Sequence, residues 1–236
     1  MILCGGRGVR ALPETLEVPK PLLLVGGRPV LGHVMEIYAR QGFTEFILAA
    51  GYKAEMVWKF AQGLPADWSV DVVDTGEDTG TGGRVQRVAE RVTEPFHLTS
   101  SDGLGDVDLK ALVAFHAGHA GSTTVTTVAL PSQYGTFDVG PDGLVSGFRE
   151  KPKLADHHIN AGFFVMDRRV FDTWAGDDLE REVLPALGAA RELYAYNHHG
   201  FWKSMDTQKD AQELSALCAE GPGPWMGGPG PSHGGL

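Results

Sequence analysis

The sequence has few of the residues on which disulfide frameworks and zinc sites depend. Its 236 residues include two cysteines, Cys4 and Cys218, which lie near opposite ends of the chain and form no Cys-x-x-Cys pair. We therefore expect neither a disulfide scaffold nor a cysteine zinc site, and a reducing, cytoplasmic location is the default. No stretch is apolar enough to cross a bilayer, and the first residues lack the features of a secretory signal, so we expect no membrane partner.

Positive charge is also scarce. Lysine and arginine number 20 against 30 aspartate and glutamate residues, and the formal net charge is −10. This balance argues against a nucleic-acid partner or an anionic membrane surface, because both require broad basic patches. A phosphate-bearing ligand would have to be met by local basic groups, for which Arg10, Lys20 and Arg84 are the candidates.

Two familiar nucleotide-binding motifs are missing as well. The sequence contains no Gly-x-x-x-x-Gly-Lys-[Ser/Thr], which excludes a Walker-type loop. Gly6-Arg7-Gly8 resembles the start of Gly-x-Gly-x-x-Gly, but position 11 is alanine and no acidic ribose partner is evident. A dinucleotide-binding fold of that kind is therefore not expected.

What the chain does have at its start is a different glycine loop. Gly5, Gly6 and Gly8 follow a short apolar stretch, and Pro19-Lys20-Pro21 comes soon after. Glycine lets the backbone approach a ligand closely and turn its N–H groups toward phosphate oxygens. The two prolines restrict the directions in which Lys20 can point. Alone, such a loop could equally be an ordinary turn.

The hydrophobic pattern predicts an α/β fold. Apolar runs at 46–50, 70–73 and 96–99 are typical of strands, and helical spacing recurs at 31–38, 56–60, 85–92 and 109–113. This alternation indicates a doubly wound, mostly parallel sheet. After residue 121 the chain becomes β-rich, with a hairpin around Asp142-Gly143. We expect a single domain over 1–220 with halves 1–120 and 121–220, and a disordered Gly/Pro-rich tail at 221–236.

Polar residues gather where strands are expected to end. Loops 5–10 and 76–84 and Asp102 fall there, and Asp206 precedes the last predicted helix. In an open α/β sheet, ligands bind beyond the carboxyl ends of the strands. Each signal has an ordinary alternative: Asp206 suits a helix cap, and Glu150-Lys151 suits a solvated hairpin end. In combination, two carboxylates, three basic groups and two glycine loops favour a phosphate ligand with Mg²⁺.

The order of six motifs resembles that of the sugar-phosphate nucleotidyltransferases. These are Leu-Cys-Gly-Gly-Arg-Gly-Val-Arg, Pro-Lys-Pro, Ser-Asp-Gly, Phe-Arg-Glu-Lys-Pro, Ile-Asn-Ala-Gly-Phe-Phe and Met-Asp-Thr. The segment 74–84, together with Gly-Phe-Trp before Met-Asp-Thr, resembles the glucose-1-phosphate cytidylyltransferases of that family in particular. The resemblance implies a nucleotide-diphospho-sugar transferase-like fold, with a nucleotide-binding half over 1–120 and a smaller, sugar-binding half over 121–220.

The resemblance also implies a reaction and a site. CTP would transfer its nucleotidyl group to α-D-glucose 1-phosphate by Mg²⁺-assisted in-line attack, giving CDP-glucose and pyrophosphate for deoxysugar biosynthesis, and the enzyme would be a homo-oligomer. Lys20, Arg10, Asp102 and Asp206 would be catalytic, and the two aspartates would hold Mg²⁺. The sugar phosphate would meet Glu150, Lys151 and Asn160. The implied nucleotide-binding residues are Leu3, Gly5, Gly6, Gly8, Val9, Arg10, Lys20, Thr81, Gly82, Gly83, Arg84 and Ser101.

Three departures from the family pattern keep alternatives open. Val9 stands where threonine is usual, Ser101 stands where glycine is usual, and Met1-Ile2-Leu3 leaves a short first strand. These departures motivate a second hypothesis, a catalytically weak or inactive subunit that binds nucleotide sugars. A third hypothesis keeps the enzyme but changes the base or the sugar.

Overall fold

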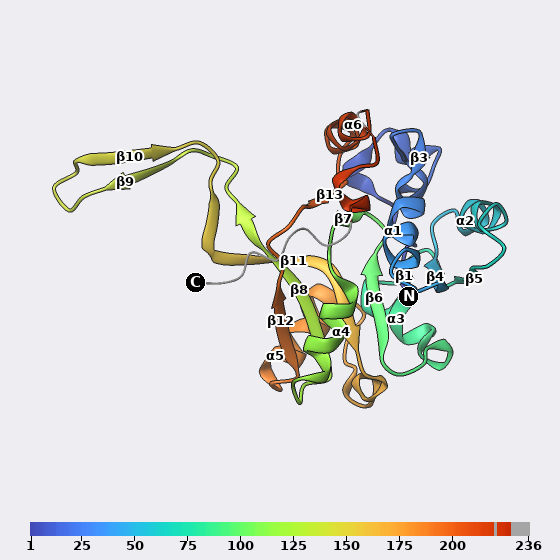
Figure 1. Ribbon diagram of the computed structural model, residues 1–236. Coiled ribbons are helices and arrows are strands. Elements are labelled where there is room, and N and C mark those ends of the chain that lie inside the picture. Colours follow the sequence, from blue (N-terminus) through green and yellow to red (C-terminus); the bar gives the residue numbers. More distant parts are fainter. Residues whose placement is uncertain (220, 228–236) are drawn as a thin grey trace.

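The computed structural model describes residues 1–219 and 221–227, and a seven-stranded sheet forms its centre in the order β12-β8-β11-β6-β1-β4-β5 (Figure 1). The strands are β1 (Ile2–Leu3), β4 (Glu45–Ala50), β5 (Ser69–Asp74), β6 (Phe96–Ser100), β8 (Thr123–Pro131), β11 (Lys153–Met166) and β12 (Leu193–Asn197). β11 is antiparallel to both its neighbours, whereas the other pairs are parallel. The predicted mostly parallel α/β sheet is confirmed.

Both faces of the sheet are covered by helices. Alternate residues of a strand point to opposite faces, so Phe163 of β11 belongs to one apolar cluster and Phe164 to the other. The first face packs against α1 (Val30–Ala39), α2 (Ala54–Ala61), α4 (Leu109–Ala117) and α6 (Gln208–Leu217), and the second against α3 (Thr81–Arg87) and α5 (Leu184–Ala189). No helix in residues 1–219 or 221–227 combines the length and apolarity needed to cross a bilayer.

The central strand β1 is as short as the sequence predicts. It pairs through Ile2 and Leu3 with the longer strands β4 and β6 on either side. Its end delivers the first glycine loop, residues 5–10, to the middle of the sheet. Because parallel strands end at the same edge of the sheet, residues 74–80 after β5 and Asp102 after β6 arrive at the same edge as that loop.

The hairpin predicted around Asp142-Gly143 is formed by β9 (Thr136–Val139) and β10 (Val145–Arg149). It projects from the body of the molecule as a long arm (Figure 1). Several of its large apolar side chains are exposed, among them Phe137 at 60% and Phe148 at 55%. The arm therefore carries apolar surface that nothing in the described part of this chain covers.

The expectation of a disordered tail over 221–236 is wrong for residues 221–227. Pro224–Met226 form a short 3-10 helix, and the Trp225 side chain is buried in the first apolar cluster. Its indole Nε1 donates to His33 Nδ1 at 3.3 Å. One large aromatic residue outweighs the local Gly/Pro composition, because burying its surface repays the cost of ordering the segment. Residues 228–236 lie outside the described part of the chain.

Candidate active site

A cleft of about 820 Å³ opens at the edge of the sheet where β1 and β6 end. Both glycine loops contribute to its walls, and the segments around residues 102, 160, 178 and 204 complete them. Thirteen of the sequence-predicted site residues line this cleft: Leu3, Gly5, Gly6, Gly8, Val9, Arg10, Lys20, Thr81, Arg84, Ser101, Asp102, Asn160 and Asp206.

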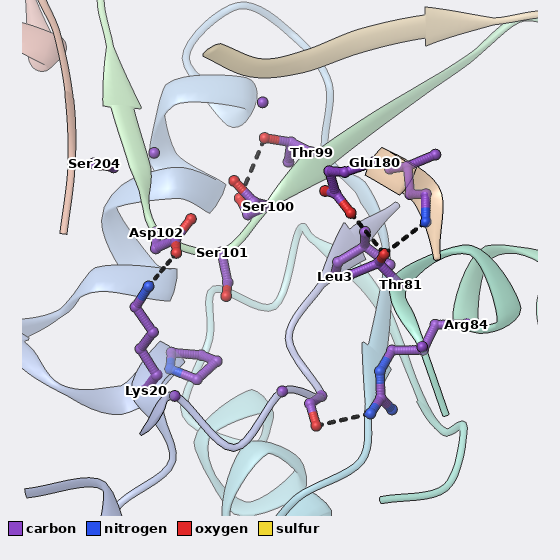
Figure 2. Close-up of a pocket in the computed structure, with 18 of the residues that line it drawn as sticks. Leu3, Lys20, Thr81, Arg84, Thr99, Ser100, Ser101, Asp102, Glu180 and Ser204 are labelled. Atoms are coloured by element: carbon purple, nitrogen blue, oxygen red, sulfur yellow. Dashed lines mark hydrogen bonds and ion pairs between the residues drawn. The ribbon is translucent and has the colours of Figure 1, made fainter. Parts of the chain in front are cut away.

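One wall of the cleft carries a cluster of opposite charges. Lys20 Nζ contacts Asp102 Oδ2 and donates to Asp206 Oδ1 at 2.8 Å, and Arg10 Nη2 lies 2.9 Å from the same Asp206 oxygen. Figure 2 shows Lys20 pointing at Asp102 from below. Residues separated by up to 186 positions therefore meet at one ammonium group.

Short backbone contacts fix this cluster. The 3-10 helix Lys20–Leu22 follows Pro19, and Lys20 is only 9% exposed. β13 (Trp202–Ser204) pairs with β7 (Gly103–Gly105), and the Met205 N–H donates to the Asp102 carbonyl at 2.9 Å. This pairing sets the two aspartates side by side although they are distant in sequence.

The charges in the cluster stabilise one another. Burial alone would lower the pKa of Lys20, but the carboxylates of Asp102 and Asp206 outweigh it and raise that pKa. Burial would raise the pKa of Asp206, but Lys20, with smaller contributions from Ser204 and Arg10, holds it below the ordinary value. The cluster therefore keeps Lys20 protonated and Asp206 ionised at neutral pH.

The donor set fits a magnesium ion bound together with phosphate. Asp102 and Asp206 place hard oxygen ligands against one common point, now contacted by the Lys20 ammonium. Mg²⁺ is commonly held by one or two carboxylates plus water and substrate phosphates, not by a cage made of protein alone. Residues 1–219 and 221–227 contain no group of three or more metal-binding side chains.

The glycines of the first loop serve different purposes. Gly8 adopts φ +64°, and a Cβ there would lie 2.7 Å from the Lys20 Cβ, so this position holds the loop against Lys20. A Cβ on Gly6 would meet nothing within 4 Å, which leaves its backbone open toward the cleft. The third glycine, Gly5, faces the Arg84 guanidinium, with a Cβ falling 2.2 Å from Nη1.

Arg84 lines the cleft, and its guanidinium also has a structural part. Its guanidinium is buried under both loops and donates to the carbonyls of Gly5 (2.9 Å), Ala50 (3.0 Å), Gly76 (2.7 Å) and Glu77 (3.1 Å), and to the Thr75 hydroxyl (2.7 Å). Figure 2 shows it turned to the first loop. Because both terminal nitrogens are already engaged, Arg84 ties the loops together.

The second glycine loop, residues 76–84, is hydrogen-bonded to a segment that sequence reasoning missed. The Gly80 N–H donates to Asp177 Oδ2 at 2.7 Å, and the Gly83 N–H donates to the Asp177 carbonyl at 3.0 Å. A Cβ on Gly83 would lie 1.9 Å from Asp177 Oδ1. Gly82 and Gly83 are therefore buried beneath Asp177 and do not line the cleft. Nothing in the sequence near Asp177 signals this contact across almost a hundred residues.

Thr81 joins the same contact, since its hydroxyl donates to Glu180 Oε2 at 2.8 Å and accepts from the Leu179 N–H at 2.9 Å (Figure 2). Glu180 itself lines the cleft.

The two positions that depart from the family pattern, Val9 and Ser101, differ in exposure. Val9 is 67% exposed at the cleft, whereas Ser101 is buried and continues the strand pairing through its N–H to the Leu3 carbonyl at 3.2 Å.

The three residues predicted to bind the sugar phosphate are not brought together. Asn160 lines the cleft and accepts the Gly162 N–H at 2.7 Å. Glu150 and Lys151 are exposed at the foot of the projecting arm, outside the cleft lining. The direction of the arm decides this, and local sequence does not determine that direction.

The fold and this charged cleft define an enzyme class. The family model for nucleotidyl transferases matches residues 1–215, and the chain belongs to that family. The Yersinia pseudotuberculosis protein HddC, solved in complex with GMP-PN, matches with a TM-score of 0.70 at 22% identity, covering 91% of this chain and 96% of that one. A putative glucose-1-phosphate thymidylyltransferase from Bacillus anthracis matches with a TM-score of 0.72 at 19% identity over 96% and 98%. At these identities the structures establish the fold.

Relatives with similar sequences are named for particular bases and sugars. The glucose-1-phosphate cytidylyltransferase of Salmonella typhimurium is 37% identical, covering 95% of this chain and 97% of its own length. A probable glucose-1-phosphate cytidylyltransferase of Bacillus subtilis is also 37% identical, over 95% and 98%. The mannose-1-phosphate guanyltransferase of Saccharomyces cerevisiae is 34% identical over 89% of this chain but 62% of its own length. The expected family is therefore confirmed, and the named base differs among its members.

Proposed function

We propose that this chain transfers the cytidylyl group of CTP to glucose 1-phosphate, releasing pyrophosphate. The observation that carries a nucleotidyl transfer is the meeting of Lys20, Asp102 and Asp206 at one point of the cleft. The choice of CTP and glucose 1-phosphate follows the full-length relatives with those names. The same proposal assigns nucleotide binding to residues 1–120 and sugar binding to residues 121–220.

A phosphate oxygen of the sugar phosphate forms a bond to the α-phosphorus of CTP, and the bond from that phosphorus to the bridging oxygen of pyrophosphate breaks. The attacking oxygen is already anionic, because the second pKa of a phosphate monoester is roughly 6. No general base is required, and catalysis consists of alignment and neutralisation of charge. Lys20 and Arg10 supply positive charge at the reacting phosphates, and the open backbone of Gly6 lets the triphosphate approach.

Asp102 and Asp206 would hold Mg²⁺, which would offset charge on the α-phosphate and the leaving group. Lys20 and Arg10 form ion pairs with the same carboxylates that would hold the metal. With Mg²⁺ and nucleotide bound, Asp102 and Asp206 would face the metal, and Lys20 and Arg10 would face phosphate oxygens. The basic and acidic groups of the cluster therefore neutralise one another's charge in this structure.

Substrate choice is tested by pyrophosphate release with CTP, UTP, GTP and dTTP, each against glucose 1-phosphate and mannose 1-phosphate. We expect turnover to be fastest with CTP and glucose 1-phosphate. A clear preference for another base or sugar would overturn that part of the proposal and favour a different member of the family. Binding of CTP without turnover by any pair would favour the inactive nucleotide-sugar-binding subunit. The variant Lys20→Met is the control for contaminating activity.

The projecting arm supports the expected homo-oligomer. Phe137 and Phe148 lie 4.9 Å apart between ring centres and are both mostly exposed, on a two-stranded hairpin that has little stability alone. A second copy of this chain would cover that surface. Association would also give Glu150 and Lys151, which stand outside their own cleft, a neighbouring molecule to contact. Sedimentation velocity tests this, and a monomer at micromolar concentration would refute it.

A further inference from the structure

Arg7 lies at the tip of the first glycine loop and belongs to none of the roles described so far. Its Nη2 is 2.8 Å from Glu77 Oε1 and 3.4 Å from Asp78 Oδ1, both on the second glycine loop. Its guanidinium carbon also lies 5.6 Å from the centre of the Tyr52 ring. Arg7, Glu77 and Asp78 all line the cleft. An ion pair therefore joins the tips of the two loops across the cleft.

The two arginines that connect the loops, Arg7 and Arg84, differ in how much free energy it takes to break their contacts. Buried Arg84 holds the roots of the loops, including the Glu77 backbone carbonyl at 3.1 Å. The Arg7 pair is exposed, at 53% for the Arg7 side chain and 45% for that of Glu77. Exposed ion pairs are worth about 0.2–1 kcal/mol. The roots are thus fixed, while the bridge between the tips can open at little cost.

The charge balance of the cleft gives this bridge a function. Lys20 and Arg10 are paired with aspartates that the proposed Mg²⁺ would take over, whereas Glu77 and Asp78 belong to no such group. A nucleoside triphosphate brings several negative charges to the loop that carries Arg7. Its phosphate oxygens accept charge-assisted hydrogen bonds from a guanidinium at least as well as a solvated carboxylate does.

Building on the proposed function, we propose that Arg7 is a latch. In the free protein it holds the second glycine loop to the first, and on entry of a nucleoside triphosphate its guanidinium passes from Glu77 to a phosphate oxygen. Gly6 lies next to Arg7, and because an added Cβ there would meet nothing within 4 Å, the backbone has room for that change. Arg7 thereby couples phosphate binding to the side-chain positions of Glu77 and Asp78, and acts as a positioning residue.

The latch predicts that substitutions of Glu77 and of Arg7 change the KM for CTP in opposite directions. Glu77→Gln removes the competitor for Arg7, so the KM for CTP should fall by about 1.4- to 5-fold, the factor that corresponds to an exposed ion pair. Arg7→Met removes the phosphate partner, so the KM should rise by about tenfold while kcat changes less. Asp78→Asn should act like Glu77→Gln but more weakly, because its contact is 3.4 Å and its side chain is 93% exposed.

The measurements are steady-state pyrophosphate release and calorimetric binding of CTP and of inorganic tripolyphosphate. Glu90→Gln, which removes a surface charge outside the cleft lining, is the matched control. If Glu77→Gln and Arg7→Met both weaken binding, or if neither changes it, the latch is refuted. Opposite shifts in tripolyphosphate affinity, in a protein that turns over no nucleotide, would support the latch and refute the proposed function separately.

Discussion

The two adjacent glycines of the first loop should tolerate alanine very differently. In Gly5→Ala the new Cβ would lie 2.2 Å from Arg84 Nη1, so the guanidinium must move away from its five acceptors. In Gly6→Ala the new Cβ meets no protein atom within 4 Å. One substitution therefore strains the buried connection between the loops, and the other fills space that belongs to the ligand.

The size of the first effect follows from the hydrogen bonds that are lost. A hydrogen bond to a charged group contributes about 1.5–3 kcal/mol, so losing two of the five costs about 3–6 kcal/mol. For a chain of this length each kcal/mol shifts Tm by about 2–4 °C, which predicts a fall of about 6–24 °C. Gly6→Ala should change the free energy of unfolding by less than about 0.5 kcal/mol and instead raise the KM for CTP.

Thermal and guanidinium chloride unfolding measure the first quantity, and initial rates of pyrophosphate release measure the second. The double variant Gly5→Ala/Arg84→Met separates the clash from a general effect of alanine on the backbone. Once Arg84 is gone, adding Gly5→Ala should cost little further stability. The reasoning fails if Gly5→Ala is as stable as the parent protein, or if Gly6→Ala loses as much stability.

Three further predictions concern the site, the core and the arm. Lys20→Met and Asp102→Asn should each lower kcat by at least about a hundredfold while changing unfolding much less, and near-normal turnover would refute the assigned roles. Burial lowers the pKa of His97 to about 4, with a smaller contribution from the N-terminal ammonium. The unfolded chain then binds a proton that the folded one does not, so stability should fall by up to about 3 kcal/mol as pH drops from 6.5 to 4. His97→Phe should flatten that decline, and an unchanged pH profile would contradict it. Phe137→Ser with Phe148→Ser should shift the sedimentation coefficient toward a monomer without lowering Tm, and loss of folding would point to a structural role instead.

Much of the fold follows from local pattern. The alternation of apolar runs with helical spacing predicts a doubly wound sheet, because a strand buried on both faces must be apolar throughout and its connecting helix must be amphipathic. The charged cluster was also predictable, since Lys20, Asp102 and Asp206 sit in recognisable motifs at strand ends. Only Asp102 follows a strand of the central sheet, and the pairing of β13 with β7 brings Asp206 beside it.

The remaining features depend on contacts between distant segments. Arg84 looks like a ligand cation in the sequence, but burial between five acceptors makes it a structural tie. Asp177 sits in no motif, yet it packs so closely on Gly80 and Gly83 that neither position has room for a Cβ. Trp225 orders a Gly/Pro-rich segment through one buried ring.

The sequence by itself determined which chemistry the chain carries, because residue types and short spacings fix charge, ligand preference and strand or helix tendency. The tertiary structure alone decided which of those residues face the cleft. Long-range packing sets the direction of a side chain or of the projecting arm, and packing energy depends on partners that lie far away in the sequence.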